Sequence, residues 1–239
     1  MVKTAIILAA GLGSRLGAKT EHAPKGFLEI DGQSLIVRSL NNLIDSGIER
    51  IIIGTGYMSE AYEQLAFDYP QVECVKNDVF ATSGSMYTLY CLRNVIDEDF
   101  LILESDLLYD KCGLSMLLKE PHKDVILSSG KSNSNDEVYI EVDHNLNLVN
   151  MSKEPEKLGS IYSELVGITK LSYSSYKKVC SGFEKIDNIR LEYEAGLVVA
   201  SLKTSIKVLK IQDYTWCEID DDNHLDRAIN KVYPKIKKK

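Results

Sequence analysis

The sequence is poor in basic residues and has no paired cysteines. Its 28 lysines and arginines are outnumbered by 35 acidic residues, which gives a net charge of −7. A nucleic-acid partner is therefore not expected, because neutralising phosphates requires a basic surface. The five cysteines stand singly, without a Cys-x-x-Cys pair. This pattern argues against a zinc site or a disulfide framework and is typical of a reducing compartment.

Signals for membrane insertion or export are missing as well. No apolar run approaches the roughly 20 residues that cross a bilayer. The first residues lack the basic flank and the cleavage site of a signal peptide. We therefore expect a cytoplasmic protein with no membrane partner. Hydrophobic residues make up 44% of the chain and charged residues 26%, so a packed globular core is expected.

Apolar runs alternate with amphipathic segments along the chain. The runs predict buried strands at 4–9, 51–55, 72–75, 100–103, 124–128 and 206–211. Helical spacing is found at 35–46, 59–68, 172–180, 188–202 and 223–232, and a hairpin is expected from 138–142 and 146–151. This alternation predicts βαβ units and a parallel sheet. Because the chain has no internal repeat and no long linker, we expect one domain over residues 1–239.

A glycine loop follows the first predicted strand. Gly11 and Gly13 let the backbone pass close to a ligand, and Arg15 and Lys25 could meet its phosphates. The loop is not a P-loop, and Leu16 stands where a Rossmann fingerprint has its third glycine. An isolated Gly-x-Gly is most often a structural turn. The whole string Leu-Ala-Ala-Gly-x-Gly-x-Arg-Leu with its downstream Pro-Lys is a far more specific pattern.

Two further stretches carry polar groups at the expected ligand-binding edge of the sheet. Glu104, Ser105 and Asp106 follow the strand at 100–103, where carboxylates are costly unless they are paired or bound to a metal. Asp106 is therefore a candidate ligand of a divalent cation, with a surface turn as the alternative. Gly84 and Ser85 start a predicted helix, which is either an ordinary cap or a helix end whose free backbone donors face a ligand.

These motifs resemble those of the nucleotidyltransferases that join a nucleoside triphosphate to a phosphate-bearing small molecule. With Gly84 to Leu89, Glu104-Ser105-Asp106 and Glu218-Ile219-Asp220 included, the chain is similar to small cytidylyltransferases of the phosphocholine and 2-aminoethylphosphonate type. The resemblance implies an α/β fold with a Rossmann-like mixed, mostly parallel sheet flanked by helices, of the nucleotide-diphospho-sugar transferase type. It also implies a nucleotide-binding core at about 1–128 and 205–239, with a small acceptor-binding or lid region at about 129–204.

The resemblance also assigns roles by motif position. Arg15 and Lys25 would hold the triphosphate, and Lys153 would face the phosphoryl group of the acceptor. Asp106 and Asp220 would hold Mg²⁺ on the α-phosphate. The nucleotide would lie against Leu8, Ala9, Ala10, Gly11, Gly13, Ser14, Gly84, Ser85, Glu104 and Ser105. The substrates implied are CTP and a small phosphonate or phosphate.

The identity of the acceptor depends on its head group. A quaternary ammonium favours an aromatic cage, whereas a primary ammonium donates three hydrogen bonds and needs oxygen acceptors. The expected acceptor region carries Asp136, Glu137, Glu192, Tyr193 and Glu194, four acidic residues and one tyrosine. This composition favours 2-aminoethylphosphonate over phosphocholine, although each carboxylate could also belong to a solvated surface.

Other functions stay open at the level of the sequence. The main alternative is phosphocholine cytidylyltransferase, followed by a sugar-1-phosphate nucleotidyltransferase and a non-catalytic homologue with the same fold. The retention of Arg15, Lys25, Asp106 and Asp220 argues against loss of catalysis. The sequence also leaves a homo-oligomer open.

Overall fold

The computed structural model describes residues 2–134 and 136–238. Its strands are β1 (Thr4–Ala9), β2 (Glu29–Ile30), β3 (Gln33–Ser34), β4 (Arg50–Thr55), β5 (Val72–Lys76), β6 (Phe100–Glu104), β7 (Leu107–Tyr109), β8 (Val125–Ser129), β9 (Tyr139–Val142), β10 (Leu148–Ser152), β11 (Ser163–Leu171), β12 (Lys207–Ile211) and β13 (Trp216–Glu218). Its α-helices are α1 (Leu35–Asp45), α2 (Ser59–Asp68), α3 (Ser85–Cys91), α4 (Lys111–Lys119), α5 (Tyr173–Phe183), α6 (Tyr193–Ser201), α7 (Asp222–Arg227) and α8 (Tyr233–Lys237).

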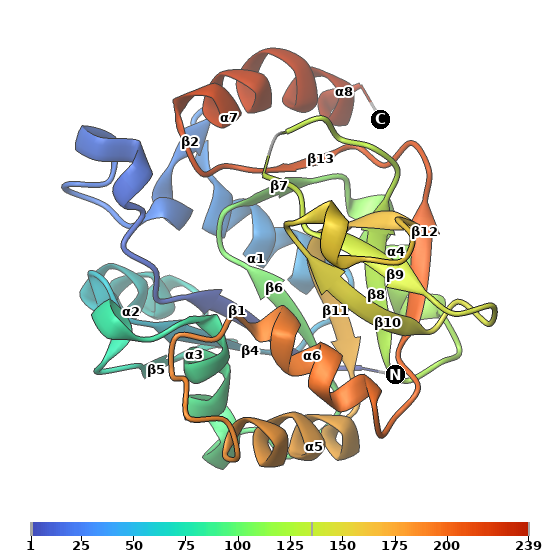
Figure 1. Cartoon of the computed structure of the whole chain (residues 1–239). Helices are drawn as coiled ribbons and strands as arrows, with labels where there is room; N and C mark the ends of the chain where they lie inside the picture. The colour runs from blue at the N-terminus through green and yellow to red at the C-terminus, as the bar shows by residue number, and fades with distance from the viewer. Residues whose placement is uncertain (1, 135, 239) are drawn as a thin grey trace.

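A mixed sheet forms the centre of the molecule (Figure 1). Within the described residues it has nine strands, and seven of them follow the order β10-β9-β11-β6-β1-β4-β5. β1 lies between β6 and β4 and is parallel to both, whereas β11 is antiparallel to β6. β8 pairs with β11 and, in parallel, with β12. The expected α/β fold with a mixed sheet flanked by helices is thus confirmed.

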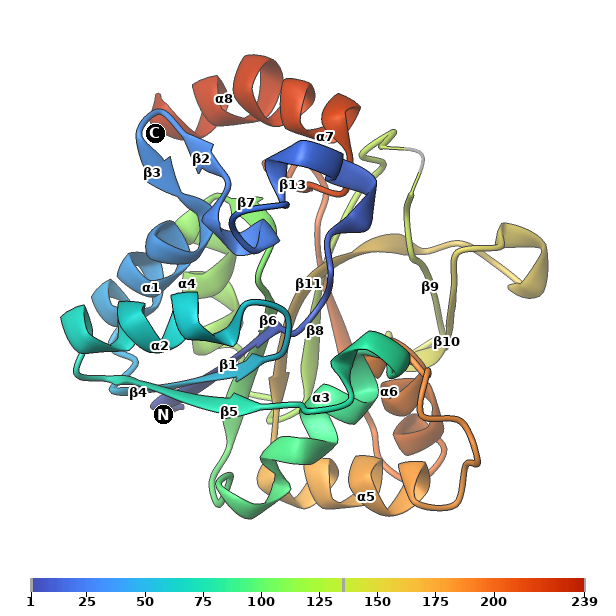
Figure 2. The same cartoon turned by 90° about the vertical axis from the view of Figure 1, so that its left-hand side faces the viewer.

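The alternation of side chains along the central strands fills a core on each face of the sheet. In β1, Ile7 packs into one core cluster and Ile6 into the other, because successive side chains of a strand point to opposite faces. The first core is closed by apolar side chains of α1, α2 and α4, and the second by those of α3, α5 and α6. Figure 2 shows these two groups of helices on opposite sides of the sheet.

Two predicted helices differ from those in the structure. The helix expected at 188–202 begins only at α6, because the preceding segment forms a turn at 189–190 and binds the start of α3. The amide of Gly84 donates to the carbonyl of Ile189 over 2.8 Å, and that of Met86 to Leu191 over 3.1 Å. The helix expected at 223–232 is α7 (Asp222–Arg227), which continues as a π-helical turn, Ala228–Val232, into α8.

No helix among the described residues combines the length and the apolar character needed to cross a membrane.

Candidate active site

A pocket of about 450 Å³ lies at the carboxyl ends of β1 and β6. These strands are parallel neighbours, with Leu8 opposite Glu104, so the loops that follow them reach the same edge of the sheet. The other walls come from the starts of α3 and α6, from the end of β13 and from residues 132, 134 and 136–138. All the site residues predicted from the sequence line this pocket except Ser14, which is exposed.

The glycine loop turns sharply after β1. Gly13 has a left-handed backbone with φ +64°, a conformation that costs glycine little. A Cβ at this position would lie 3.1 Å from Cγ2 of Thr20, whose hydroxyl donates to the Gly13 carbonyl over 2.9 Å. Leu16 is buried in the next turn and anchors it to the body of the molecule. The turn thereby holds Arg15 at the wall of the pocket.

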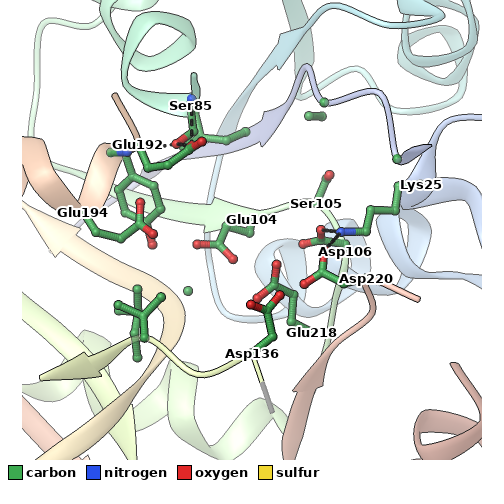
Figure 3. Close-up of a pocket in the computed structure, with 18 of the residues that line it drawn as sticks. Lys25, Ser85, Glu104, Ser105, Asp106, Asp136, Glu192, Glu194, Glu218 and Asp220 are labelled. Atoms are coloured by element: carbon green, nitrogen blue, oxygen red, sulfur yellow. Dashed lines mark hydrogen bonds and ion pairs between the residues drawn. The ribbon is translucent and has the colours of Figure 1, made fainter. Parts of the chain in front are cut away.

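Lys25 lies between two carboxylates (Figure 3). Its Nζ donates to Asp106 over 2.5 Å and also to Asp220. The Lys25 side chain is 14% exposed and that of Asp220 4%. Burial alone would lower the pKa of Lys25, but the charges of Asp106, Asp220 and Glu218 outweigh it and raise this pKa. Lys25 is therefore a fixed positive charge inside the pocket.

Three carboxylates form a cluster in which an oxygen of each lies within 4.8 Å of the others. Glu104 and Asp106 are two residues apart at the end of β6, and Glu218 is brought beside them because β13 pairs with β7. Burial raises the pKa of Glu104 to about 8, with further contributions from Asp106 and Glu194. Burial, followed by Glu104, Asp106 and Asp220, raises the pKa of Glu218 well above its usual range. Charges concentrated in this way are costly without a cation.

The oxygen ligands at this cluster suit a divalent cation. Asp106 Oδ1 and Asp220 Oδ2 are buried, and neither has a hydrogen-bond partner within the described chain. Carboxylate oxygens are the ligands that Mg²⁺ prefers. The cluster adds Glu104 and Glu218 to the predicted pair Asp106 and Asp220, and Lys25 contacts both members of that pair. The repeated spacing of two residues in Glu104-x-Asp106 and Glu218-x-Asp220 is the sequence signal for the additional residues.

Asp136 joins two cations that come from distant parts of the chain. Its Oδ2 accepts from Nη1 of Arg15 over 2.8 Å, and its Oδ1 accepts from Nζ of Lys153 over 2.7 Å. Nη2 of Arg15 also pairs with Asp220 over 2.6 Å. Burial opposes ionisation of Asp136, but the hydrogen bonds from Lys153 and Arg15 outweigh it and lower the pKa of this carboxyl. The three predicted phosphate-binding cations thus face the pocket.

The predicted acceptor residues differ in the hydrogen bonds that their carboxylates accept within the chain. Glu192 accepts from the amide of Ser85 over 3.1 Å and from its hydroxyl over 2.5 Å. Together with the two carbonyl contacts described above, this pairs the first amides of α3, so the expectation that they are free to face a ligand was wrong. Glu137 accepts from the amide of Ser134 over 2.5 Å.

Glu194 and Tyr193 form the remaining part of the predicted acceptor region. Tyr193 is buried, and Glu194 is partly buried at the wall of the pocket. Burial raises the pKa of Glu194 to about 7, and Glu192 adds to this effect. Tyr193 lies beside Glu104 at the end of β6; burial, followed by the charge of Glu104, raises the pKa of the Tyr193 hydroxyl well above its usual range.

His224 of α7 is a site residue that the sequence analysis did not identify. Its Nδ1 accepts from the amide of Asp220 over 3.3 Å, and its Nε2 lies 3.0 Å from the carbonyl of Ser134. Arg227, one turn later, donates to the carbonyl of Ser132 over 2.8 Å. These contacts hold one wall of the pocket to α7. No local sequence pattern indicates the contacts with Ser132 and Ser134, because these partners are about 90 residues away in the sequence.

Comparisons with known proteins point to one family. The family model for the MobA-like NTP transferase domain matches residues 5–134. The chain is 34% identical over 104 residues to the 2-aminoethylphosphonate cytidylyltransferase of Lancefieldella rimae, an alignment that covers 43% of this chain and 42% of the relative. It is 38% identical over 98 residues to the choline-phosphate cytidylyltransferase of Streptococcus pneumoniae, with 41% and 42% covered. The chain thus spans less than half the length of these two relatives.

A more distant relative is matched over nearly its whole length. The CTP:phosphoglutamine cytidylyltransferase of Campylobacter jejuni is 23% identical over 252 residues, which cover 95% of this chain and 99% of that protein. Among solved structures, the CTP:phosphocholine cytidylyltransferase from Streptococcus pneumoniae superimposes with a TM-score of 0.81 at 22% identity, covering 95% of this chain and 97% of that one. The inositol-1-phosphate CTP transferase from T. maritima gives 0.83 at 22% identity, with 99% and 96% covered. These structures share the nucleotide-diphospho-sugar transferase fold with this chain.

Proposed function

Because the chain belongs to the family of MobA-like NTP transferase domains, we propose that it is a CTP-dependent cytidylyltransferase. The proposed reaction transfers CMP to 2-aminoethylphosphonate and gives CMP-2-aminoethylphosphonate and pyrophosphate. A phosphonate oxygen attacks the α-phosphorus of CTP, a new P–O bond forms, and the bond from that phosphorus to the bridging oxygen of the β-phosphate breaks. The electron pair of this bond leaves with pyrophosphate.

The observation that carries this proposal is the arrangement of charges in one pocket. Arg15, Lys25 and Lys153 line it together with the cluster of Glu104, Asp106 and Glu218. Both reactants are anions, so three cations around them reduce their repulsion and stabilise the charge that develops on the transferred group. The acceptor oxygen is already ionised at neutral pH, so no general base is required. The main task of the protein is to align the two substrates in line.

Mg²⁺ is the proposed cofactor. Asp106 and Asp220 would hold it together with Glu104 and Glu218, and Lys25 contacts both aspartates. When bound, the ion neutralises phosphate oxygens and polarises them as a Lewis acid. The glycine loop from Leu8 to Gly13 and the walls at Gly84, Ser85 and Ser105 supply the proposed nucleotide site.

The acceptor's ammonium is proposed to lie near Glu194. This carboxylate faces the pocket beside Tyr193, whereas Asp136, Glu137 and Glu192 have partners within the chain. A primary ammonium loses its hydration in such a place unless oxygen atoms replace the water. A specific observation favours phosphocholine as the second candidate: Tyr193 and Trp216 both line the pocket, and aromatic faces attract a quaternary ammonium.

Pyrophosphate release tests the proposal. The assay compares CTP with UTP, ATP and GTP, and 2-aminoethylphosphonate with phosphocholine, glucose 1-phosphate and phosphoglutamine. We expect kcat/KM to be highest for CTP and the phosphonate, with roughly 10²- to 10⁴-fold discrimination against the acceptor that lacks donors. Equal or better use of phosphocholine would make the choline enzyme the correct assignment.

A matched pair of variants tests the proposed metal site in the same assay. Asp106→Asn should lose at least ~100-fold in rate, the order of one lost transition-state contact. Asp45→Asn removes an equal charge from an exposed ion pair with Lys111 and should keep the wild-type rate. Near-normal turnover of Asp106→Asn would show that Asp106 is not part of the metal site.

A further inference from the structure

Asp136 occupies a position that resembles that of a bound anion. One of its carboxylate oxygens accepts from Arg15 over 2.8 Å and the other from Lys153 over 2.7 Å. The two cations come from different parts of the chain, since Arg15 is 121 residues and Lys153 is 17 residues from Asp136. The carboxylate is 20% exposed, and the two cations are 56% and 53% exposed, so an anion from solution can reach all three.

We propose that Asp136 is an internal counter-anion that a phosphoryl group of a substrate must displace from Arg15 and Lys153. Asp136 thereby weakens the binding of every anion that needs these two cations. The inference rests on the proposed function only in naming a phosphoryl group as the natural competitor. It does not depend on whether the head group of the acceptor is a primary or a quaternary ammonium.

Electrostatics favour displacement over binding beside Asp136. A phosphonate next to this carboxylate would bring like charges within a few ångströms, a repulsive arrangement, and the facing donors of Arg15 and Lys153 are already used. Exchange replaces one negative charge between two cations with two, so a phosphonate dianion gains attraction. A sulfonate carries the same single charge as the carboxylate that it would replace, so it gains no additional attraction to the two cations.

Arg15 keeps a second ion pair when Asp136 is lost. Arg15 is also paired with Asp220 over 2.6 Å through its other terminal nitrogen. The segment before Asp136 is held to α7 by His224 at Ser134 and by Arg227 at Ser132. Asp136→Asn therefore removes the charge of the counter-anion without removing the other contacts of this wall.

The test is isothermal titration calorimetry in metal-free buffer with methylphosphonate and methanesulfonate as probes. These compounds have similar shapes but different charges at pH 8, and neither carries a head group. In Asp136→Asn the dissociation constants should fall by roughly 3- to 30-fold, the range expected when one or two exposed ion pairs no longer compete. The fall should be similar for the two probes, because the same internal competitor is removed for both.

Three controls accompany this measurement. Asp45→Asn, which removes the same charge from an exposed pair, should leave both dissociation constants unchanged. Asp136→Glu keeps the charge and should keep both dissociation constants near the wild-type values. Asp136→Ser is the second neutral variant, and thermal melts show that each protein is folded before titration.

Unchanged or weaker binding in both folded neutral variants would overturn the inference, because Asp136 would then position the two cations rather than compete for them. Pyrophosphate release is measured on the same preparations. Tighter anion binding without any turnover of the wild type would defeat the proposed function and leave the role of Asp136 intact. Normal turnover with unchanged anion binding would defeat the role of Asp136 alone.

Discussion

Lys25 is the residue on which the charge balance of the pocket depends. It is a buried cation that donates to two carboxylates, Asp106 and Asp220, each of which has another oxygen without a hydrogen-bond partner among the described residues. Removing a cation from such a group leaves buried charge uncompensated, which costs more than the loss of an exposed ion pair. Lys25 therefore contributes to stability as well as to the proposed binding of the triphosphate.

Lys25→Ala should be strongly destabilised in EDTA. A broken buried pair costs about 3–5 kcal/mol, which corresponds to a fall in Tm of roughly 6–20 °C for a chain of this size. Added Mg²⁺ should restore part of this loss and should raise the Tm of the variant more than that of the wild type, because the metal replaces the missing charge. Differential scanning calorimetry with and without Mg²⁺ measures both effects.

Lys19→Ala is the control, since Lys19 pairs over 2.5 Å with Asp222 at the surface. An unchanged Tm for Lys25→Ala in EDTA would show that Asp106 and Asp220 are stable without this lysine.

At the scale of single elements, the middle of β11 makes room for the acidic cluster at the end of β6. The pairing of β11 with β8 is irregular between Leu165 and Thr169, and Gly167 inside this stretch has φ +83°. A Cβ at Gly167 would lie 2.8 Å from Oε2 of Glu104. Glycine is thus needed here both for its backbone conformation and for the close approach of a carboxylate.

Gly167→Ala should destabilise the protein and displace Glu104. Strain at a left-handed backbone costs about 1–3 kcal/mol, and the contact with Glu104 adds to it. The matched control is Gly47→Ala, which has φ +87° but no atom within 4 Å of its Cβ. The expected result is a lower Tm for Gly167→Ala than for Gly47→Ala, together with a weaker Mg²⁺-induced rise in Tm. Equal losses in the two variants would mean that Glu104 tolerates the added methyl group.

At the scale of the whole molecule, part of the excess of acidic residues lies around one pocket. Glu104, Glu194 and Glu218 all have raised pKa values, chiefly because each is buried. Ionising such groups costs free energy in the folded state but not in the unfolded chain. The folded protein therefore holds these protons more tightly, and its stability falls as the pH rises from the usual glutamate range through the raised pKa values.

Glu194→Gln should remove part of this pH dependence. Since the pKa of Glu194 is raised to about 7, the wild type should lose stability relative to the variant between about pH 5 and pH 8, by up to a few kcal/mol. Urea unfolding in EDTA at several pH values measures the difference between the two proteins. Glu60→Gln, on the exposed side of α2, is the control and should give a constant difference. A constant difference for Glu194→Gln as well would contradict the raised pKa.

The sequence by itself determined the elements whose signals are local. The apolar run of β1, the glycine turn after it and the position of Asp106 behind β6 all follow from period, turn chemistry and strand ends. Each of these patterns is contained within about ten residues, so no knowledge of distant partners is required. For the same reason most of the predicted strands and helices are found in the structure. The exceptions are the segment before α6, whose conformation depends on α3, and the helix expected at 223–232, which contains a π-helical turn.

Only the tertiary structure decided how the charges are paired. Asp136 meets Arg15 across 121 residues, Glu192 meets Ser85 across 107, and Lys25 meets Asp220 across 195. A sequence pattern cannot distinguish a carboxylate that is available to a ligand from one that is paired within the chain, because the residue type is the same in both cases. The choice depends on distance and burial, since the energy of two charges depends on their separation and on the water between them. Folding fixes both quantities.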